Sequence, residues 1–323
     1  MLKKKLKIGV LFGGKSAEYE VSVVSAENII KALDKNKYQI YPIKINREGE
    51  FDLASLEKVD LVFPILHGPF GEDGSMQGLL KILGIPFVGP SVLGSALGMD
   101  KDVMKRLFRD AGIPIGKFIT VHSNEKISFE KVRKVLGLPV FIKPANMGSS
   151  IGISKVNNKK EFEKAIKEAF LYDSKIVIEE NISGQEIECS ILGNENPMAS
   201  TLGEVIPKND FYSYKAKYVD QDGAVLLIPA RLSKIITKKV QNIAIKVFKV
   251  LNCEGMGRVD FFVKKSGEII VNEINTIPGF TPISMYPKLW EASGISTTKL
   301  LDRLIELSIE RFETESRLKN IIK

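Results

Sequence analysis

Short apolar runs alternate with helical patterns through the first hundred residues. Runs of strand length occur at residues 7–12, 38–45, 60–66 and 85–88. Between them, residues 21–33 and 76–83 carry apolar side chains at helical spacing. This alternation predicts a small doubly wound parallel sheet, in which ligands gather at the carboxyl ends of the strands.

From about residue 100 the pattern indicates mixed rather than alternating elements. Residues 127–137 and 159–171 have helical spacing, and the stretch LPVFIKPANMGSSIGISKV reads as strand, glycine-rich turn and strand. Further strands, a long helix at 233–251, a hairpin and C-terminal helices follow. We therefore predict α/β and α+β architecture in three domains: residues 1–99, 100–183 and 184–323.

Composition places the chain among globular proteins that do not span membranes. Hydrophobic residues make up 44% of the 323 positions and charged residues 27%. No apolar run approaches the roughly 20 residues that cross a bilayer. Cys189 and Cys253 belong to no paired motif, which favours buried, reduced thiols. The basic start MLKKKLKIGVLFGG reads as a first strand with a solvated edge, which predicts a cytoplasmic protein.

The formal charge of +8 raises the question of a nucleic-acid partner. The lysines are scattered among acidic residues on helical faces, and no dense basic block with aromatic residues occurs. We therefore expect no nucleic-acid binding. A modest positive excess also suits a protein that handles a nucleotide polyphosphate.

Residues 9–16, GVLFGGKS, match the P-loop pattern. A P-loop needs these residues in a turn around phosphate, whereas Val10, Leu11 and Phe12 complete an apolar strand. The carboxylates of the following AEYE would also approach the phosphate. We interpret the match as fortuitous.

The hairpin GRVDFFVKKSGEIIVNEIN carries the most informative polar residues. Asp260, Glu273 and Asn275 offer oxygen ligands without histidine or cysteine, a set that suits Mg²⁺. Residues two apart share a strand face, so Arg258 joins Asp260, and Glu273 joins Asn275. A surface ladder of salt bridges is the alternative, but the apolar neighbours favour a metal site.

Other segments suit a nucleotide. Lys143 ends a strand before a loop rich in glycine and serine, and Lys101 begins a helix. Glu179 and Glu186, near a buried strand, could bond an adenine amine and a ribose hydroxyl. Each lysine taken alone is more often a solvated side chain.

Eight motifs, in this order, resemble the D-alanine–D-alanine ligase family of the ATP-grasp superfamily: GGKSAEYEVS, HGPFGEDGSMQG, MDK, FIKPANMGSSIGISKV, EENISGQE, YKAKY, GMGRVDFF and NEINTIPGFTPISMYP. The resemblance covers nearly the whole chain. It implies a three-domain ATP-grasp fold, ATP bound between the central and C-terminal domains, and two Mg²⁺ or Mn²⁺ ions. It also implies a cytoplasmic homodimer whose product enters peptidoglycan.

The resemblance assigns a nucleotide and metal role to ten positions. Asp260 would hold one metal ion, Glu273 would bridge both, and Asn275 would complete the second. The remaining seven would contact ATP: Lys101, Lys143, Ser149 and Lys217 at the phosphates or the loop over them, Glu179 and Ile182 at adenine, and Glu186 at ribose.

The resemblance also assigns residues to the two D-alanines. Glu18 would anchor the first ammonium, although it could merely cap the following helix. Ser149 and Tyr218 would tie a lid at residues 211–223 to the loop over the site. The other substrate contacts would be His67 in the first subsite, Arg258 and the Gly279 N–H at the oxyanion, and Ser284 with Met285 at the second carboxylate. For His67, a purely structural hydrogen bond is equally favoured.

The implied reaction has two steps. The first D-alanine carboxylate attacks the γ-phosphate to give an acyl phosphate and ADP, and the second amine then displaces phosphate. Related ligases use D-lactate or D-serine second; Tyr218 and Met285 match the alanine-adding type. Residues 145–147 and 282–283 depart from commoner family residues and leave loop closure and second-site affinity open. A P-loop enzyme and a non-catalytic binding protein remain as rival functions.

Overall fold

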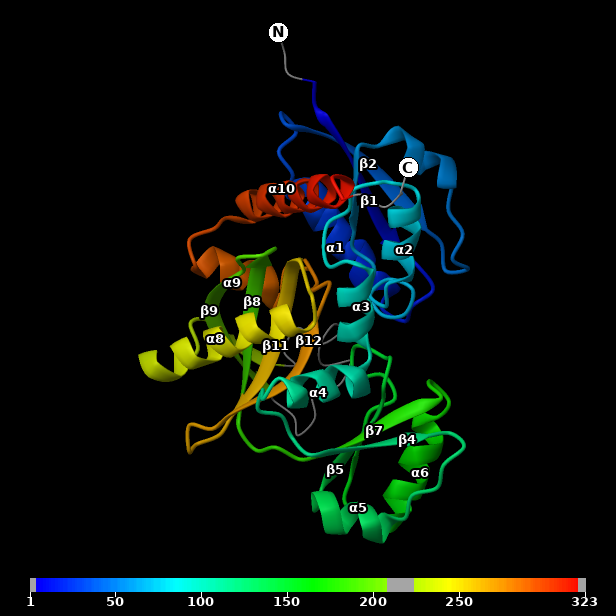
Figure 1. Cartoon of the computed structure of the whole chain (residues 1–323), viewed down its shortest axis with the longest axis vertical. Coiled ribbons are helices and arrows are strands. Elements are labelled where there is room, and N and C mark those ends of the chain that lie inside the picture. Colours follow the sequence, from blue (N-terminus) through cyan, green and yellow to red (C-terminus); the bar gives the residue numbers. More distant parts are fainter. Residues whose placement is uncertain (1–3, 208–223, 319–323) are drawn as a thin grey trace.

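The computed structural model describes residues 4–207 and 224–318 and arranges them around three sheets (Figure 1). The first sheet is parallel, in the order β2-β1-β3. Its strands are β1 (Leu6–Gly13), β2 (Tyr38–Ile45) and β3 (Leu61–Pro64). The accompanying helices are α1 (Tyr19–Ala32), the 3₁₀ helix η1 (Leu53–Lys58), α2 (Ser75–Ile82) and α3 (Val92–Met99).

The fourth run expected in this sheet, residues 85–88, forms only an isolated parallel bridge between Phe87 and Val62. The Val62 N–H donates to the Pro86 carbonyl and the Val88 N–H to the Val62 carbonyl. Pro86 has no N–H of its own, so it cannot donate a ladder bond. The segment thus lies along the sheet edge with fewer backbone bonds than a strand.

The second sheet is antiparallel and has the order β4-β7-β5-β6. Its strands are β4 (Phe118–His122), β5 (Val140–Pro144), β6 (Ser154–Val156) and β7 (Lys175–Glu180). The helices of this region are α4 (Lys101–Asp110), α5 (Phe129–Leu136) and α6 (Lys159–Ala169). An apolar core that includes Val132, Ile142 and Phe162 joins α5 and α6 to the sheet.

The third sheet is also antiparallel, in the order β10-β9-β8-β11-β12. Its strands are β8 (Gln185–Gly193), β9 (Met198–Pro207), β10 (Ala224–Leu227), β11 (Gly255–Val263) and β12 (Ile269–Asn275). Its helices are α8 (Lys234–Val250), α9 (Met285–Ala292) and α10 (Thr297–Ser316). The α/β and α+β architecture predicted from the sequence is confirmed.

Polar side chains begin several of these helices. The oxygens of Asp100, Ser128, Asn158, Ser233 and Ser296 accept backbone N–H groups in the first turns of α4, α5, α6, α8 and α10. Such caps satisfy donors that the helix itself leaves unpaired. Each helix therefore starts at a defined residue, which matters most at α4, whose first residue is Lys101.

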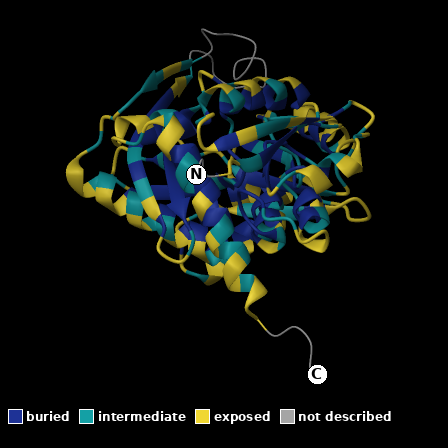
Figure 2. Cartoon of the chain, turned by 90° about the horizontal axis from the view of Figure 1, so that it is seen from above, coloured by how far each residue is buried: buried dark blue, intermediate teal, exposed yellow. Residues whose placement is uncertain are grey.

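The last helix packs back on the first sheet. Leu300, Leu301 and Leu304 of α10 share one buried core with Ile8 of β1 and Phe63 of β3. Figure 1 shows α10, in red, lying against α1, in blue, and Figure 2 shows buried segments inside and exposed residues along the outer helix faces. The elements β1 and α10 are thus held together by apolar packing. In the described ranges, no helix has the length and apolar character needed to cross a bilayer.

Candidate active site

A cavity of about 570 Å³ lies where strands of the second and third sheets meet loops and a helix end from the region of the first sheet. Every site residue predicted from the sequence that the structure describes lines this cavity. Those residues are Glu18, His67, Lys101, Lys143, Ser149, Glu179, Ile182, Glu186, Arg258, Asp260, Glu273, Asn275, Gly279, Ser284 and Met285. Lys217 and Tyr218 lie outside the described residues.

The β11–β12 hairpin brings its polar residues to one face, as the period of two predicts. Arg258 is paired with Asn275 across the hairpin, and Asp260 with Glu273. The Arg258 guanidinium binds both oxygens of Asp260, at 2.7 Å each. The Asn275 amide donates to Asp260 Oδ2 at 3.0 Å. The side chains of Arg258 and Asp260 are less than one-fifth exposed, so this is no surface ladder of salt bridges.

The hairpin residues fit a hard divalent cation by their donor chemistry. Two carboxylate side chains and one amide side chain line the cavity, and their oxygens are the ligand type that Mg²⁺ prefers. In the described ranges, no three His, Cys, Asp or Glu side chains are grouped as a metal site. Bound metal would therefore depend on the Asn275 amide and on oxygens from a substrate, as is usual for Mg²⁺ with nucleotides.

Lys143 and the buried Lys105 flank Glu179. Lys143 Nζ lies 2.9 Å from Glu179 Oε2, and Lys105 Nζ lies 3.2 Å from Oε1. Burial alone would raise the pKa of Glu179, but the two ammonium groups outweigh it and lower the pKa to about 2. Both carboxylate oxygens that were expected to face adenine thus already bind lysines. Any adenine contact would use their remaining lone pairs.

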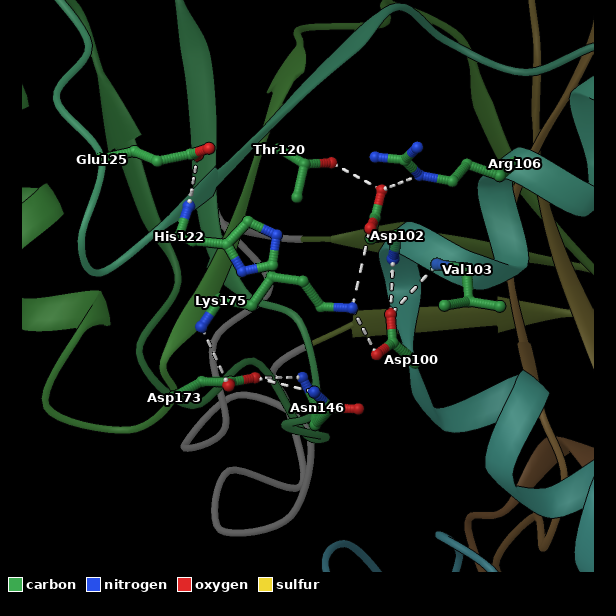
Figure 3. Close-up of polar contacts among 10 residues, drawn as sticks. All are labelled: Asp100, Asp102, Val103, Arg106, Thr120, His122, Glu125, Asn146, Asp173 and Lys175. Atoms are coloured by element: carbon green, nitrogen blue, oxygen red, sulfur yellow. Dashed lines mark hydrogen bonds and ion pairs between the residues drawn. The ribbon is translucent and has the colours of Figure 1, made fainter.

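The first turn of α4 is fixed by Asp100, the residue directly before Lys101 (Figure 3). The Asp100 carboxylate accepts the N–H groups of Asp102 and Val103 and binds Lys175 Nζ at 2.6 Å. The Lys101 N–H donates to the Ala145 carbonyl at 3.0 Å. Its Nζ donates to the Met147 carbonyl at 2.7 Å and lies 3.8 Å from Glu273. Lys101 therefore links α4, the loop after β5 and the β12 strand.

Glu18 connects the first domain to the loop after β5. The Ser149 hydroxyl donates a hydrogen bond to Glu18 Oε1. A Cβ on Gly148 would lie 2.9 Å from Glu18 Oε2, so a side chain at this position would displace the Glu18 carboxylate. Ser149 and Ser150 have positive φ angles of 49° and 61°, a conformation that non-glycine residues seldom adopt. The loop is thus held over the site in a strained form.

The loop after β12 is anchored to α1. Ser25 Oγ accepts the Phe280 N–H at 3.1 Å, and the Asn28 amide donates to the Phe280 carbonyl at 3.0 Å. A Cβ on Gly279 would lie 2.9 Å from the Ser284 hydroxyl oxygen. The Gly279 backbone and the Ser284 side chain therefore lie side by side in the cavity, where a carboxylate could meet both.

Met285 is the first residue of α9, and its side chain is buried. It is 4% exposed, and its methyl group packs where a Cβ on Gly203 of β9 would fall. The residue therefore shapes the wall of the cavity by packing rather than by a polar contact.

Sequence reasoning missed three charged residues that line or support the cavity. Glu188 binds Arg258 at 2.9 Å, Lys105 binds Glu179, and Glu72 lines the cavity near Glu18. Two of the three continue a strand or helix spacing that is visible in the sequence. Glu188 is two residues after Glu186 on one strand, and Lys105 is four after Lys101 on one helix. Glu72 lies in the HGPFGEDG loop, where no period applies.

Residues 9–16 do not form a phosphate-binding turn. Strand β1 runs from Leu6 to Gly13, so it contains the apolar run at 7–12 and extends one residue beyond it. The Gly13 N–H donates to the Ser22 hydroxyl at 2.8 Å, and Lys15 lies beside Gly49. The backbone amide at the centre of the motif is therefore used inside the domain.

A parallel α/β domain joined to two antiparallel α+β units, with lysines and carboxylates around one shared cavity, defines the ATP-grasp class of ligases. The family model for the D-ala D-ala ligase C-terminus matches residues 107–306. The family model for the D-ala D-ala ligase N-terminus matches residues 7–57 and 52–90. A D-alanine–D-alanine ligase of Oceanobacillus iheyensis is 48% identical, with 98% of each chain covered. The chain belongs to the D-alanine–D-alanine ligase family.

Solved structures agree with this membership. The D-alanine–D-alanine ligase of Coxiella burnetii matches with a TM-score of 0.88 and 40% identity, covering 97% of this chain and 96% of that one. The ATP complex of the Bacillus anthracis ligase gives 0.84 and 34%, covering 96% and 99%. The VanG D-Ala:D-Ser ligase of Enterococcus faecalis gives 0.85 and 38%, covering 94% and 100%.

Proposed function

We propose that the protein joins two D-alanines into D-alanyl-D-alanine for peptidoglycan precursors, converting ATP to ADP and phosphate. Family membership supports the reaction class. The observation that carries the proposal is the single cavity that gathers Glu18, the Lys101 and Lys143 ammonium groups, and the Arg258–Asp260 face. These groups complement an amino-acid ammonium, a triphosphate and an oxyanion.

In the first step, the carboxylate oxygen of one D-alanine attacks the γ-phosphorus, and the bond to the β-phosphate oxygen breaks to release ADP. Glu18 holds the ammonium of that D-alanine, with His67 beside it. Lys101 and Lys143 contact the phosphates as point charges, joined by Lys217. Adenine lies near Glu179 and Ile182, and Glu186 binds ribose.

Asp260, Glu273 and Asn275 hold two Mg²⁺ or Mn²⁺ ions in this proposal. When bound, the ions offset the negative charge on the transferring phosphoryl group. For Asp260 to serve as a ligand, its oxygens must exchange hydrogen bonds with Arg258 and Asn275 for the ion. The Asn275 amide must then turn its oxygen toward the metal, because its nitrogen now donates to Asp260.

In the second step, the amine of the other D-alanine attacks the acyl carbon, and phosphate leaves from the tetrahedral intermediate. Arg258 and the Gly279 N–H stabilise the oxyanion, a contribution of about 3 kcal/mol per donor. Ser284 receives the second carboxylate, next to Met285. Ser149 and Tyr218, with Glu18, hold the loop closed so that water does not reach the acyl phosphate.

The discriminating experiment supplies purified protein with ATP, Mg²⁺ and D-alanine and measures ADP, phosphate and dipeptide. Equal amounts of ADP and D-alanyl-D-alanine support the proposal, and L-alanine should not replace D-alanine. The similarity to a D-Ala:D-Ser ligase makes D-serine the second candidate substrate, with D-lactate as a third. Preferred use of either at neutral pH would overturn the alanine assignment, and no turnover would favour a binding protein.

The assembly and location form part of the same proposal. We infer a homodimer in the cytoplasm, where ATP is available and the buried thiols of Cys189 and Cys253 stay reduced. We assign substrate binding to residues 1–99 and the two ATP-grasp lobes to residues 100–183 and 184–323. Sedimentation equilibrium of the full chain tests the dimer directly, and a monomer mass at micromolar concentration would contradict it.

A further inference from the structure

Three hydrogen-bond acceptors lie near Gly68, at the end of the cavity proposed to bind the first D-alanine. We call this region the amino-acid end. The Gly68 N–H donates to Glu72 Oε2 at 2.7 Å. A Cβ on Gly68 would lie 2.9 Å from Glu18 Oε2, and His67 immediately precedes it. Glu18, His67 and Glu72 all line the cavity. Both carboxyl groups thus lie beside Gly68, and the Ile277 backbone hydrogen-bonds both Glu72 and the His67 ring, which makes the three side chains neighbours.

The groups around Glu72 do not fully compensate a negative charge on its carboxyl group. Burial, the largest cause, and the nearby Glu18 carboxylate, the next largest, raise the pKa of Glu72 to about 8. The N–H groups of Gly68 and Ile277 and the ammonium of Lys101 oppose this rise only in part. The Glu72 carboxyl therefore holds a proton at neutral pH in the free protein.

His67 supplies the third acceptor. Its side chain is 5% exposed, and burial lowers its pKa to about 4, so the ring is neutral. The Ile277 backbone is one hydrogen-bond partner of the ring. Within residues 4–207 and 224–318, Nε2 has no hydrogen-bond partner. A buried imidazole nitrogen without a partner is costly and points to a ligand that donates to it.

We propose that Glu18, Glu72 and His67 form a three-acceptor pocket for the primary ammonium of the first substrate, and that Glu72 releases its proton as that ammonium binds. The inference rests on the proposed function, because it takes the amino acid at Glu18 to be the substrate. An ammonium carries three N–H donors, which matches three acceptors. The released proton goes to solvent, and the Glu72 carboxylate then pairs with the substrate.

The exchange of a proton for an ammonium follows from the charges. A cation within about 4–6 Å lowers a carboxyl pKa by roughly one to three units. Starting from a pKa of about 8, Glu72 would become at least half ionised at pH 7 once the substrate is bound. The affinity for D-alanine should therefore increase roughly six- to twentyfold between pH 6.5 and 8.5, because deprotonation of Glu72 then precedes binding.

Isothermal titration of D-alanine into the full chain tests this coupling. The protein is saturated with Mg²⁺ and a non-hydrolysable ATP analogue, and titrations at pH 7 use PIPES and imidazole, whose ionisation heats differ. We expect wild type to release between about half and one proton per first D-alanine bound. Glu72→Gln should release nearly none, and its affinity should not change with pH.

Asp73→Asn is the matched control. Asp73 is on the same loop, where its carboxylate accepts the N–H groups of Phe70 and Ser75 and does not line the cavity. This variant should release as many protons as wild type. Unchanged binding of the ATP analogue verifies that each variant is folded, and if Glu72→Gln does not fold, the pH dependence of wild-type affinity decides alone.

The outcomes separate this inference from the proposed function. Wild type that produces D-alanyl-D-alanine but releases no proton overturns the Glu72 pocket and leaves the ligase function standing. Equal proton release by wild type and Glu72→Gln does the same. Proton-coupled D-alanine binding without any dipeptide product supports the pocket and overturns the ligase function.

Discussion

The two ends of the cavity treat charge in opposite ways. At the proposed phosphate end, Lys105 and Lys143 are already paired with Glu179 at 3.2 and 2.9 Å, and the pKa of that carboxyl is lowered to about 2. At the amino-acid end, Glu72 lies near a second carboxyl and its pKa is raised to about 8. The buried carboxylate is thus balanced by ion pairs at the phosphate end and neutralised by a bound proton at the amino-acid end.

This difference matches the ligands that each end is proposed to receive. A triphosphate needs cations held in place before it arrives, and buried lysines stay charged only when carboxylates offset their desolvation. A single ammonium needs acceptors, but uncompensated buried carboxylates repel each other. A proton on one of them removes that repulsion until the substrate replaces it.

The largest expected effect is at the hairpin between the two ends. Glu273→Gln keeps the size of the side chain but removes the charge that would bridge two metal ions. Loss of several kcal/mol of transition-state stabilisation predicts a fall in kcat of about 10³-fold. Steady-state ADP release measures it, and circular dichroism verifies the fold. Full activity in this variant would refute the metal role.

The ion pairs of the phosphate end are tested by Lys105→Met. The change leaves one oxygen of buried Glu179 and the Asn272 carbonyl without their ammonium partner. Breaking a buried pair should cost about 3 kcal/mol of unfolding free energy. We expect the ATP KM to increase about tenfold, because Glu179 and Lys143 would then shift. Lys238→Met, at an exposed position of α8, is the control for losing one positive charge, and an equal effect there would contradict the account.

A smaller effect is expected where the loop after β5 meets the amino-acid end. Ser149→Ala removes the hydroxyl that donates to Glu18 Oε1. A hydrogen bond to a charged group contributes about 1.5 kcal/mol or more, which predicts about a tenfold loss of kcat/KM for D-alanine. Ser154→Ala, on β6, serves as control. An unchanged kcat/KM would mean that the Ser149 contact does not position Glu18.

The smallest effect is expected at the P-loop-like stretch, which belongs to neither end. Lys15→Ala should change the ATP KM less than about twofold, because β1 uses this segment inside the first domain. Nucleotide affinity measured by titration calorimetry provides the test. Loss of nucleotide binding would restore the P-loop interpretation and remove the basis for a phosphate end at Lys101 and Lys143.

Local patterns in the sequence predicted the elements and much of the cavity. The strand period placed Arg258, Asp260, Glu273 and Asn275 on one face, and the structure pairs them across β11 and β12. Turn composition identified the hairpin, and the apolar run through Phe12 argued against a P-loop. These features depend only on neighbours along the chain, which is why periodicity suffices for them.

Such local patterns could not predict contacts between segments that are distant in the sequence. Lys105 and Glu179 meet from α4 and β7, and Glu72 meets Glu18 across a loop and a helix start. The packing of α10 on the first sheet joins residues nearly three hundred positions apart, such as Ile8 and Leu304. Sequence spacing carries no information on these pairings, because tertiary packing alone decides them.

Anomalous scattering from Mn²⁺ is the most direct test of the claim that the hairpin binds the metal. Crystals of the full chain with Mn²⁺ and a non-hydrolysable ATP analogue would be measured at the manganese absorption edge. The account predicts peaks about 2.0–2.3 Å from oxygens of Asp260, Glu273 and Asn275, with the triphosphate between them and Lys101. Peaks elsewhere, with these three side chains bound only to protein or solvent, would contradict it.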